Sequence, residues 1–335
     1  MINYSIIGAG WRAEFYIRLA KICPDTFHLC GICIRNEEKA KELQNKYGIN
    51  SVRTLEELKK IPCDFFVNCI NKADISDLSL SLAEEGFAVL METPACVNSK
   101  QAKEYAQRLR THHRISVAEQ FHLKPMYQTV KAIIDEGIIG NVCDMEISLC
   151  HEYHAMSLIR KFLDVDSIPK VTSTKISSPL LVTNGRGGEL ENKQVKTSER
   201  FVKIFDFGEK SALYHFDRSQ YFSPIRTDSY VIHGTRGEIR DGVVRYFNQN
   251  NRFIQSNIIH NTSGNLDGFF NGTVTFENKV YYKSPFGDAR LSDEETAIGE
   301  VLLRMDSFIK TGKQFYSFDE ALKDVIFWNS ESADF

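Results

Sequence analysis

The feature that most constrains this fold is a glycine-rich turn near the start of the chain. A short apolar run ends at Gly8, and an amphipathic helical pattern begins near Ala13. Between them the sequence reads G-A-G-W-R-A, which is G-x-G-x-x-G with alanine in the last place. The first glycine permits a tight turn from strand to helix, and the last small residue lets the helix pack on a sheet. This order predicts a strand–turn–helix unit of a parallel α/β domain.

The same turn predicts a binding site for a dinucleotide. The second glycine, Gly10, lets the backbone approach a pyrophosphate, and the helix start offers N–H groups and a partial positive charge. The residues of the turn that we expect to contact the nucleotide are Gly8, Gly10, Trp11, Arg12 and Ala13.

Apolar runs and helical patterns alternate up to about residue 120. The expected strands are 27–34, 64–70, 88–91 and 115–118, and the expected helices include 36–46, 74–85 and 99–110. Gly48 is placed to end the helix at 36–46, and Thr54 with Glu57 forms a capping box for the next helix. The alternation predicts a parallel sheet with helices on both faces, and such sheets bind ligands at the carboxyl ends of their strands.

The pattern changes after residue 120, where strands follow one another with few helices between them. We expect helices at 125–136, 155–162, 296–310 and 318–328, and strands at 143–150, 171–176, 201–207, 212–216, 229–233, 243–247 and 272–276. The order of strands and helices in this half therefore predicts an α+β domain with a large, mostly antiparallel open sheet. We expect a nucleotide-binding domain at 1–120 and a substrate and oligomerisation domain at 121–335, with the substrate in a cleft at their junction.

Composition excludes several classes of protein. The 335 residues are 42% hydrophobic and 25% charged, with a net charge of −3 and no block of like charge. We therefore expect neither a nucleic acid nor a membrane as partner. A strand that begins by Tyr4 leaves no room for a signal peptide, and the eight cysteines lie mostly in apolar runs, so we expect a cytoplasmic protein. Cys30 and Cys33 are interpreted as structural, and no metal site is expected.

Five motifs in order resemble the glucose-fructose oxidoreductase, inositol dehydrogenase and rhizopine catabolism (Gfo/Idh/MocA) family. They are G-A-G at 8–10, E-T-P at 92–94, V-A-E-Q at 117–120, G-I-I-G-N-V at 137–142 and H-G-T-R-G-E-I at 233–239. The resemblance covers nearly the whole chain. It implies a Rossmann domain, a C-terminal domain on an open sheet, and NAD(P)-dependent redox chemistry on sugars, polyols and related molecules.

The chain also departs from the family pattern. Thr93 stands where the family usually has a lysine that holds the ribose and moves protons, and Cys150 stands where an aspartate commonly precedes His154 by four residues. The resemblance implies that Glu92 bonds the nicotinamide ribose. It also implies cofactor contacts for two residues that replace the usual ones, Asn71 and Gln120.

Hydride transfer needs a group that takes or gives the hydroxyl proton. Histidine suits this role because its pKa is near neutral, and His154 is our candidate acid/base. Tyr153 and His151 beside it are further candidates, as is His122, and Thr93 keeps a hydroxyl near the expected ribose. The alternative for His154 is a packed histidine at a helix start.

The end of the second strand predicts the choice of cofactor. An acidic residue there favours NAD, whereas an arginine suits the 2′-phosphate of NADP. This chain has Arg35, so we favour NADP(H) over NAD(H); the alternative is a solvated charge. Tyr221 and Arg226 lie in a polar, aromatic connection and are weaker candidates for substrate contact. Residues 183–188 are interpreted as a flexible glycine-rich connection, and the alternative is a loop that lines the substrate cleft.

The sequence thus predicts an NAD(P)-dependent oxidoreductase that acts on a carbohydrate-like hydroxyl or carbonyl. One alternative is a lyase or glycosidase that retains its nicotinamide and uses it transiently. A second is a dinucleotide-binding sensor without catalysis, which the replacements at Thr93 and Cys150 motivate. An exposed face of the second sheet favours a homo-oligomer, a dimer or a tetramer.

Overall fold

The computed structural model describes residues 1–108, 114–265 and 268–330, and the chain forms two compact units. The first comprises Met1–Pro125, Asn261–Thr273 and Lys283–Ile326. The second comprises Met126–His260, Val274–Tyr282 and the short segment from Phe327. The expected second domain at 121–335 differs from this division, because a late helix, α8 (Asp293–Thr311), packs against α1 (Trp11–Ile22) of the first unit.

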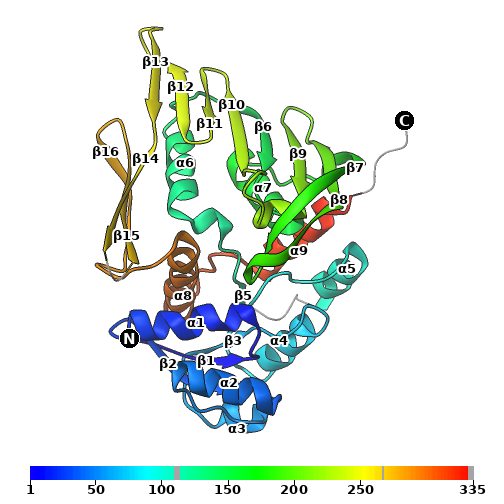
Figure 1. The fold of residues 1–335 in the computed structure, drawn as a ribbon, viewed down its shortest axis with the longest axis vertical. Coiled ribbons are helices and arrows are strands. Elements are labelled where there is room, and N and C mark those ends of the chain that lie inside the picture. The colour runs from blue at the N-terminus through cyan, green and yellow to red at the C-terminus, as the bar shows by residue number, and fades with distance from the viewer. Residues whose placement is uncertain (109–113, 266–267, 331–335) are drawn as a thin grey trace. The chain divides into compact units, whose positions relative to one another are not determined.

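The first unit contains the expected parallel sheet. Its five strands lie in the order β2-β1-β3-β4-β5. Figure 1 labels β1, β2, β3 and β5 of this sheet among the helices of the unit. They are β1 (Ile2–Ile7), β2 (Phe27–Cys33), β3 (Phe65–Asn68), β4 (Val89–Met91) and β5 (Ile115–Val117). Their side chains are mostly buried, which explains why each strand appears in the sequence as a continuous apolar run.

The helices of the first unit alternate with these strands. After α1 come α2 (Glu37–Tyr47), α3 (Leu55–Lys59), α4 (Ile75–Glu84) and α5 (Ser99–Arg108). Gly48 ends α2 in the left-handed conformation, and the capping box of Thr54 and Glu57 starts α3, both as predicted. The last two residues of the helix expected at 99–110 lie outside the described residues.

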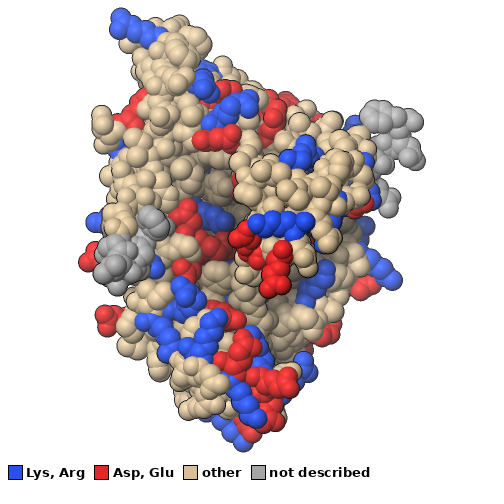
Figure 2. Space-filling view, in the orientation of Figure 1, with Lys and Arg blue, Asp and Glu red and all other residues tan. Residues whose placement is uncertain are grey.

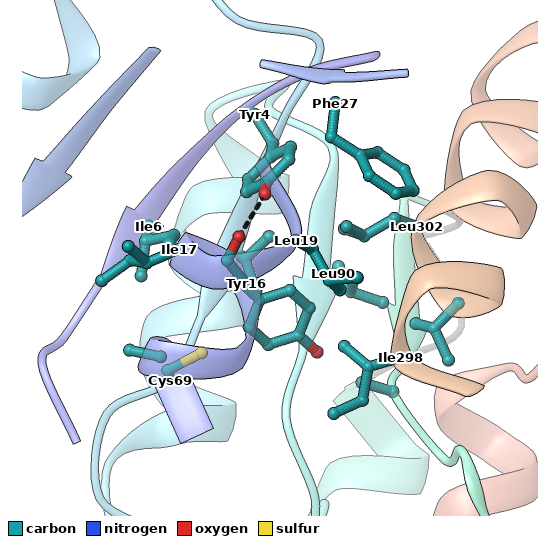
Figure 3. Packing of buried hydrophobic residues seen from close by; sticks show 14 of the residues in the cluster. Tyr4, Ile6, Tyr16, Ile17, Leu19, Phe27, Cys69, Leu90, Ile298 and Leu302 are labelled. Carbon is teal, nitrogen blue, oxygen red and sulfur yellow. Dashed lines mark hydrogen bonds between the residues drawn. The ribbon is translucent and has the colours of Figure 1, made fainter. Parts of the chain in front are cut away.

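The core of the first unit lies between the sheet and two helices. Tyr4 of β1 donates a hydrogen bond to the Tyr16 carbonyl of α1 at 2.6 Å, and both side chains are buried (Figure 3). Ile298 and Leu302 of α8 belong to the same apolar cluster. A C-terminal helix is therefore part of the first unit.

Helix α8 begins three residues earlier than the sequence pattern predicted. Ser292 accepts a hydrogen bond from the Glu295 N–H, and the Glu295 side chain accepts one from the Ser292 N–H. This capping box fixes the helix start at Asp293, whereas the apolar periodicity that we used begins only at Thr296. The first turn of α8 therefore carries three acidic residues, Asp293, Glu294 and Glu295.

The second unit is built on a mixed sheet in the order β13-β12-β11-β10-β6-β9-β8-β7. All its neighbouring strands are antiparallel except β6 and β9, so the prediction of a mostly antiparallel sheet is confirmed. The strands are β6 (Val142–Ser148), β7 (Lys170–Gly185), β8 (Gly188–Asp206), β9 (Ser211–Asp217), β10 (Ser229–Gly234), β11 (Gly237–Arg240), β12 (Val243–Phe247) and β13 (Phe253–Asn257).

The remaining elements are short strands and helices. A further sheet has the order β14-β15-β16, from β14 (Ile259–Asn265), β15 (Gly268–Phe276) and β16 (Lys279–Lys283). The helices are α6 (Pro125–Asp135), α7 (Glu152–Leu163) and α9 (Phe318–Trp328), with short 3₁₀ turns η2 (Phe121–Leu123) and η3 (Arg218–Tyr221). None of the described helices is long and apolar enough to cross a bilayer.

The connection expected at 183–188 is instead the tip of a long hairpin. Strands β7 and β8 pair from Lys170 with Asp206 out to Gly185 with Gly188, which leaves Arg186 and Gly187 as the turn. Gly188 has a φ of +105°, which a glycine adopts without strain. The strands expected at 171–176 and 201–207 cover only the inner part of this hairpin. Most of its outer part is exposed on both faces, so the sequence there lacks the apolar alternation that marks a strand.

The surface over α1 and α2 carries charges of both signs. Figure 2 shows Lys and Arg interspersed with Asp and Glu on the face drawn. Lys39 pairs with Glu14 and Glu42, and Lys46 pairs with Glu14. Such exposed pairs contribute little to stability. All eight cysteines are free.

The two glycines of the first turn should respond differently to alanine. Gly8 has a φ of +107°, and a Cβ there would lie 2.9 Å from the Cys69 carbonyl oxygen. We expect Gly8→Ala to destabilise the protein by about 3 kcal/mol through backbone strain and overpacking. A Cβ added at Gly10 would meet no atom within 4 Å. Gly10→Ala should therefore lower stability by at most about 1 kcal/mol, as a changed N-cap. Denaturant unfolding measures both, and equal losses would contradict this reading of the turn.

Candidate functional site

The glycine-rich turn presents an open helix start. Gly10 is the N-cap of α1 and leaves the helix without a side-chain cap. The space beside its α-carbon is open, whereas Ala13 is buried against the sheet. Helix N–H groups without a cap attract anions, so the turn has the chemistry that a pyrophosphate requires.

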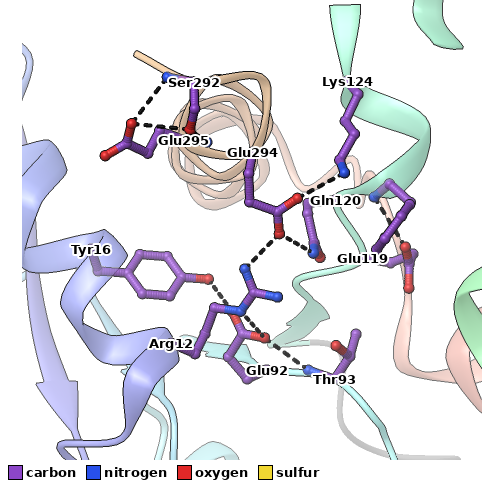
Figure 4. A network of polar contacts seen from close by, with 11 residues as sticks. Arg12, Tyr16, Glu92, Thr93, Glu119, Gln120, Lys124, Ser292, Glu294 and Glu295 are labelled. Atoms are coloured by element: carbon purple, nitrogen blue, oxygen red, sulfur yellow. Dashed lines mark hydrogen bonds and ion pairs between the residues drawn. The ribbon is translucent and has the colours of Figure 1, made fainter. Parts of the chain in front are cut away.

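Arg12, the fifth residue of the motif, lies between two carboxylates (Figure 4). Its Nη1 donates to Glu294 of α8 at 2.8 Å, and its Nε lies 3.6 Å from the Glu92 carboxylate. Only about 20% of the Arg12 side chain is exposed. The predicted cofactor contact is thus a guanidinium held in place by acidic residues from two other parts of the first unit.

Glu92 is oriented from several directions. Its Oε1 accepts a hydrogen bond from the Tyr16 hydroxyl at 2.6 Å, and its Oε2 accepts one from the Thr93 N–H at 3.2 Å. The residue is 5% exposed. These contacts fix the position of the Glu92 carboxylate.

Glu294 is the centre of this polar network. Besides Arg12, it accepts a hydrogen bond from Gln120 Nε2 at 2.9 Å and pairs with Lys124 at 3.0 Å. Burial alone would raise the pKa of Glu294, but Lys124 and Arg12 outweigh this effect and lower it to about 2. Glu294 is therefore ionised at neutral pH and holds three donors around it.

The other end of the Gln120 side chain lacks a partner among the residues that the structure describes. Gln120 is 1% exposed, and its Oε1 is buried without a hydrogen bond. An unsatisfied buried acceptor costs free energy, which a ligand donor would recover. This atom fits the presence of a bound group at the end of β5.

Glu119, next to Gln120, is fully buried. Its Oε1 accepts a hydrogen bond from the Phe121 N–H at 3.1 Å. Burial is the largest influence on its pKa and raises it to about 8, with a further increase from Glu294. Arg12 and Lys124 act in the opposite direction. At neutral pH the carboxyl group is thus largely protonated.

The other predicted residues of the first unit lie at its surface or in local turns. Trp11 is 48% exposed and packs edge-on against Phe15. Arg35 is exposed and lies two residues after the end of β2. Asn71 accepts a hydrogen bond from the Ala73 N–H and donates one to Asp74, which forms a turn before α4. The half-buried ring of His122 lies 5.5 Å from that of Tyr316.

The second unit gathers four of the predicted residues at the start of α7. The rings of His151 and His154 are 5.4 Å apart, and that of Tyr153 lies 4.3 Å from His154. Tyr221 contacts the His151 ring nitrogen Nδ1 through its hydroxyl at 2.6 Å. His154 is only 4% exposed, whereas His151 and Tyr153 are half-buried.

The hydroxyl of Tyr221 lies close to two nitrogens of His151. Its oxygen accepts a hydrogen bond from the His151 backbone N–H at 2.9 Å and lies 2.6 Å from the ring nitrogen Nδ1. Burial raises the pKa of Tyr221, so the phenol stays protonated. In the tautomer of neutral His151 that carries its proton on Nε2, Nδ1 accepts a hydrogen bond from this phenol.

Arg226 and Cys150 are the other two residues of this unit that bear on the candidate site. Arg226 is half-buried and donates to the Ile225 carbonyl at 3.1 Å. Cys150 is fully buried, in keeping with a small apolar residue rather than a charged partner for His154. Among the described residues, no group of His, Cys, Asp and Glu side chains could hold a metal ion.

Sequence reasoning missed several members of the first network, namely Tyr16, Glu119, Lys124 and Glu294. Glu294 lies 174 residues after Gln120, so no local pattern links them. One signal was available, because the sequence S-D-E-E at 292–295 is a capping box that would have placed Glu294 in the first turn of a helix.

Comparison with known proteins gives a family match for the N-terminal part of the first unit. Residues 2–121 match the family described as an oxidoreductase family with an NAD-binding Rossmann fold, Gfo/Idh/MocA. This part of the chain is therefore similar to the NAD-binding domain of that family. The match contains the turn, Arg12, Glu92 and Gln120, whereas Glu294 lies beyond it.

One curated relative and many solved structures are similar. Oxidoreductase P35 of Formosa agariphila is 24% identical over 51% of this chain, and the match spans only 54% of that relative. An oxidoreductase from Agrobacterium radiobacter, solved with NAD+, L-tartaric acid and magnesium, has a TM-score of 0.68 at 15% identity and covers 98% of this chain and 95% of its own. Levoglucosan dehydrogenase, solved with NADH and levoglucosan, has the same TM-score and coverage at 14% identity. These two structures establish the fold.

The buried Glu119 should make stability depend on pH. Its folded pKa of about 8 lies above the unfolded value of about 4.3, so folding takes up a proton between these values. Its contribution to stability is full at low pH and falls as pH rises, by about 1.4 kcal/mol per unit for one proton. Glu119→Gln should remove this slope between pH 5 and 8 in denaturant unfolding, with Glu37→Gln on exposed α2 as the control. Equal slopes in wild type and Glu119→Gln would refute the assignment.

Proposed function

We propose that this protein is an NAD(P)-dependent oxidoreductase that transfers a hydride between nicotinamide and a hydroxyl or carbonyl group of a sugar, polyol or related small molecule. The uncapped start of α1 at an open Gly10, within a Gfo/Idh/MocA nucleotide-binding unit, is the observation that carries the proposal. The known ligands of levoglucosan dehydrogenase and the L-tartaric acid complex support a polyhydroxylated substrate.

The residues of the first unit fit the cofactor. The N–H groups at the start of α1 would hold the pyrophosphate, with Gly8 shaping the turn and Gly10 leaving room for it. Glu92 would accept a hydrogen bond from a ribose hydroxyl. The next residue, Thr93, would keep its hydroxyl near the same ribose. The buried Oε1 of Gln120 would accept a further donor. When bound, NAD(P)+ supplies the hydride acceptor.

The histidines at the start of α7 supply the proton chemistry. In the oxidation of an alcohol, the hydroxyl proton would pass to an imidazole nitrogen of His154 while the carbon loses its hydride to the nicotinamide, which leaves a carbonyl. Tyr153 and the Nε2–H of His151 would donate hydrogen bonds to substrate oxygens. In the reductive direction, His154 would return the proton. His122, Tyr221 and Arg226 have weaker claims to substrate contact.

The proposal extends to assembly and compartment. Apolar side chains such as Ile204, Phe247 and Phe253 are about half exposed on the eight-stranded sheet, and a second copy of the chain would cover them in a homo-oligomer. Eight free cysteines suit the reducing cytoplasm.

Replacing His154 should reduce turnover while leaving the cofactor bound. We expect His154→Asn to lower kcat by roughly 10²–10⁴-fold, the contribution of a general acid or base, with little change in the Kd of the cofactor. His28→Asn, at an exposed site on β2, is the control, and a panel of sugars and polyols supplies the substrate. If kcat were lost in His151→Asn but not in His154→Asn, the general acid or base would be His151 rather than His154. Product formation without net change in NAD(P)H would favour the lyase alternative.

Arg35 supports a preference for NADP(H). It is exposed at the end of β2, where a 2′-phosphate would lie. We expect NADPH to bind more tightly than NADH, and Arg35→Asp to narrow or reverse the ratio of their Kd values in calorimetry. Lys41→Asp, the same charge reversal at an exposed site on α2, should leave the ratio unchanged. Equal weakening of both nucleotides by Arg35→Asp would argue for a folding effect.

A further inference from the structure

Glu294 constrains which way the Gln120 amide faces. An ionised carboxylate accepts hydrogen bonds and cannot donate one. The Gln120 side chain must therefore present its Nε2 to Glu294, as the 2.9 Å contact shows. Its Oε1 then faces away from Glu294, buried and without a partner among the described residues.

Glu294 is itself held in place. Arg12 and Lys124 approach the same carboxylate at 2.8 Å and 3.0 Å, and Glu294 lies in the capped first turn of α8 (Figure 4). Three donors, one from α1 and two from residues 120–124, leave the carboxylate little freedom. The orientation of the Gln120 amide is thus set by a rigid acceptor.

We propose that Glu294 is a positioning residue, which fixes the Gln120 amide so that Oε1 accepts a hydrogen bond from the nicotinamide half of the bound dinucleotide. This inference rests on the proposed function. A carboxamide N–H or a ribose O–H of that half would be the donor.

The order of the strands favours the nicotinamide half over the adenosine half. The phosphate turn follows β1, and the residue that would meet the adenosine ribose, Arg35, follows β2 at one edge of the sheet. Gln120 follows β5 at the opposite edge. A dinucleotide that crosses the carboxyl ends of the strands extends its other half toward β4 and β5, where Glu92 and Gln120 lie.

The experiment compares two ligands that differ in the nicotinamide. Calorimetry gives the Kd of NADH and of ADP-ribose, which lacks the nicotinamide, for wild type, Glu294→Gln and Gln120→Leu. A glutamine at 294 can donate as well as accept, so it no longer fixes the amide, and leucine removes the acceptor. We expect each variant to weaken NADH binding by about tenfold, the effect of one lost hydrogen bond, and ADP-ribose binding by less than about twofold.

Arg18→Gln is the matched control. Arg18 pairs with Glu295 at 2.8 Å, so this variant removes the neighbouring ion pair between α1 and α8 without touching the network. It should leave both Kd values unchanged. Equal weakening of NADH and ADP-ribose, or unchanged NADH binding in Glu294→Gln and Gln120→Leu, would overturn the inference. A wild type that binds ADP-ribose but neither NADH nor NADPH would overturn the proposed function together with the inference.

Discussion

A guanidinium held between two carboxylates ties the glycine-rich turn to a helix 282 residues further along the chain. Arg12 belongs to the turn, Glu92 to the end of β4 and Glu294 to the start of α8. This ion pair is partly buried, with 20% of the Arg12 side chain and 22% of the Glu294 side chain exposed. A residue of the glycine-rich turn therefore contacts a part of the chain outside the region that matches the family model.

The order of elements in the first unit could be predicted because its signals are local. Buried parallel strands appear as apolar runs, Gly48 ends a helix, and Thr54 with Glu57 begins one. The polar network could not be predicted in this way, since Gln120 and Glu294 meet only through tertiary packing. The hairpin of β7 and β8 was missed for the opposite reason: its outer residues are exposed on both faces, so burial imposes no alternation on them.

The two positions where the chain departs from the family pattern have different surroundings. Thr93 brings no cation to Glu92, but Arg12 approaches that carboxylate from α1 and Tyr16 adds a hydrogen bond. Cys150 is buried and brings no charge to the start of α7, where the phenol of Tyr221 holds the His151 ring instead. In both places neighbouring side chains orient a group that we propose to contact a ligand, Glu92 in the first unit and His151 in the second. Sequence spacing could identify His151 and His154 as candidates, but the contact between Tyr221 and the His151 ring is brought about by tertiary packing.

The most direct test of this account is a crystal structure of the protein with NADPH. We predict that the pyrophosphate lies at the start of α1 over Gly10, and that a donor of the nicotinamide half lies within hydrogen-bond distance of Gln120 Oε1, with Gln120 Nε2 still on Glu294. A dinucleotide bound away from the turn, or one that leaves Gln120 Oε1 without a partner, would contradict it.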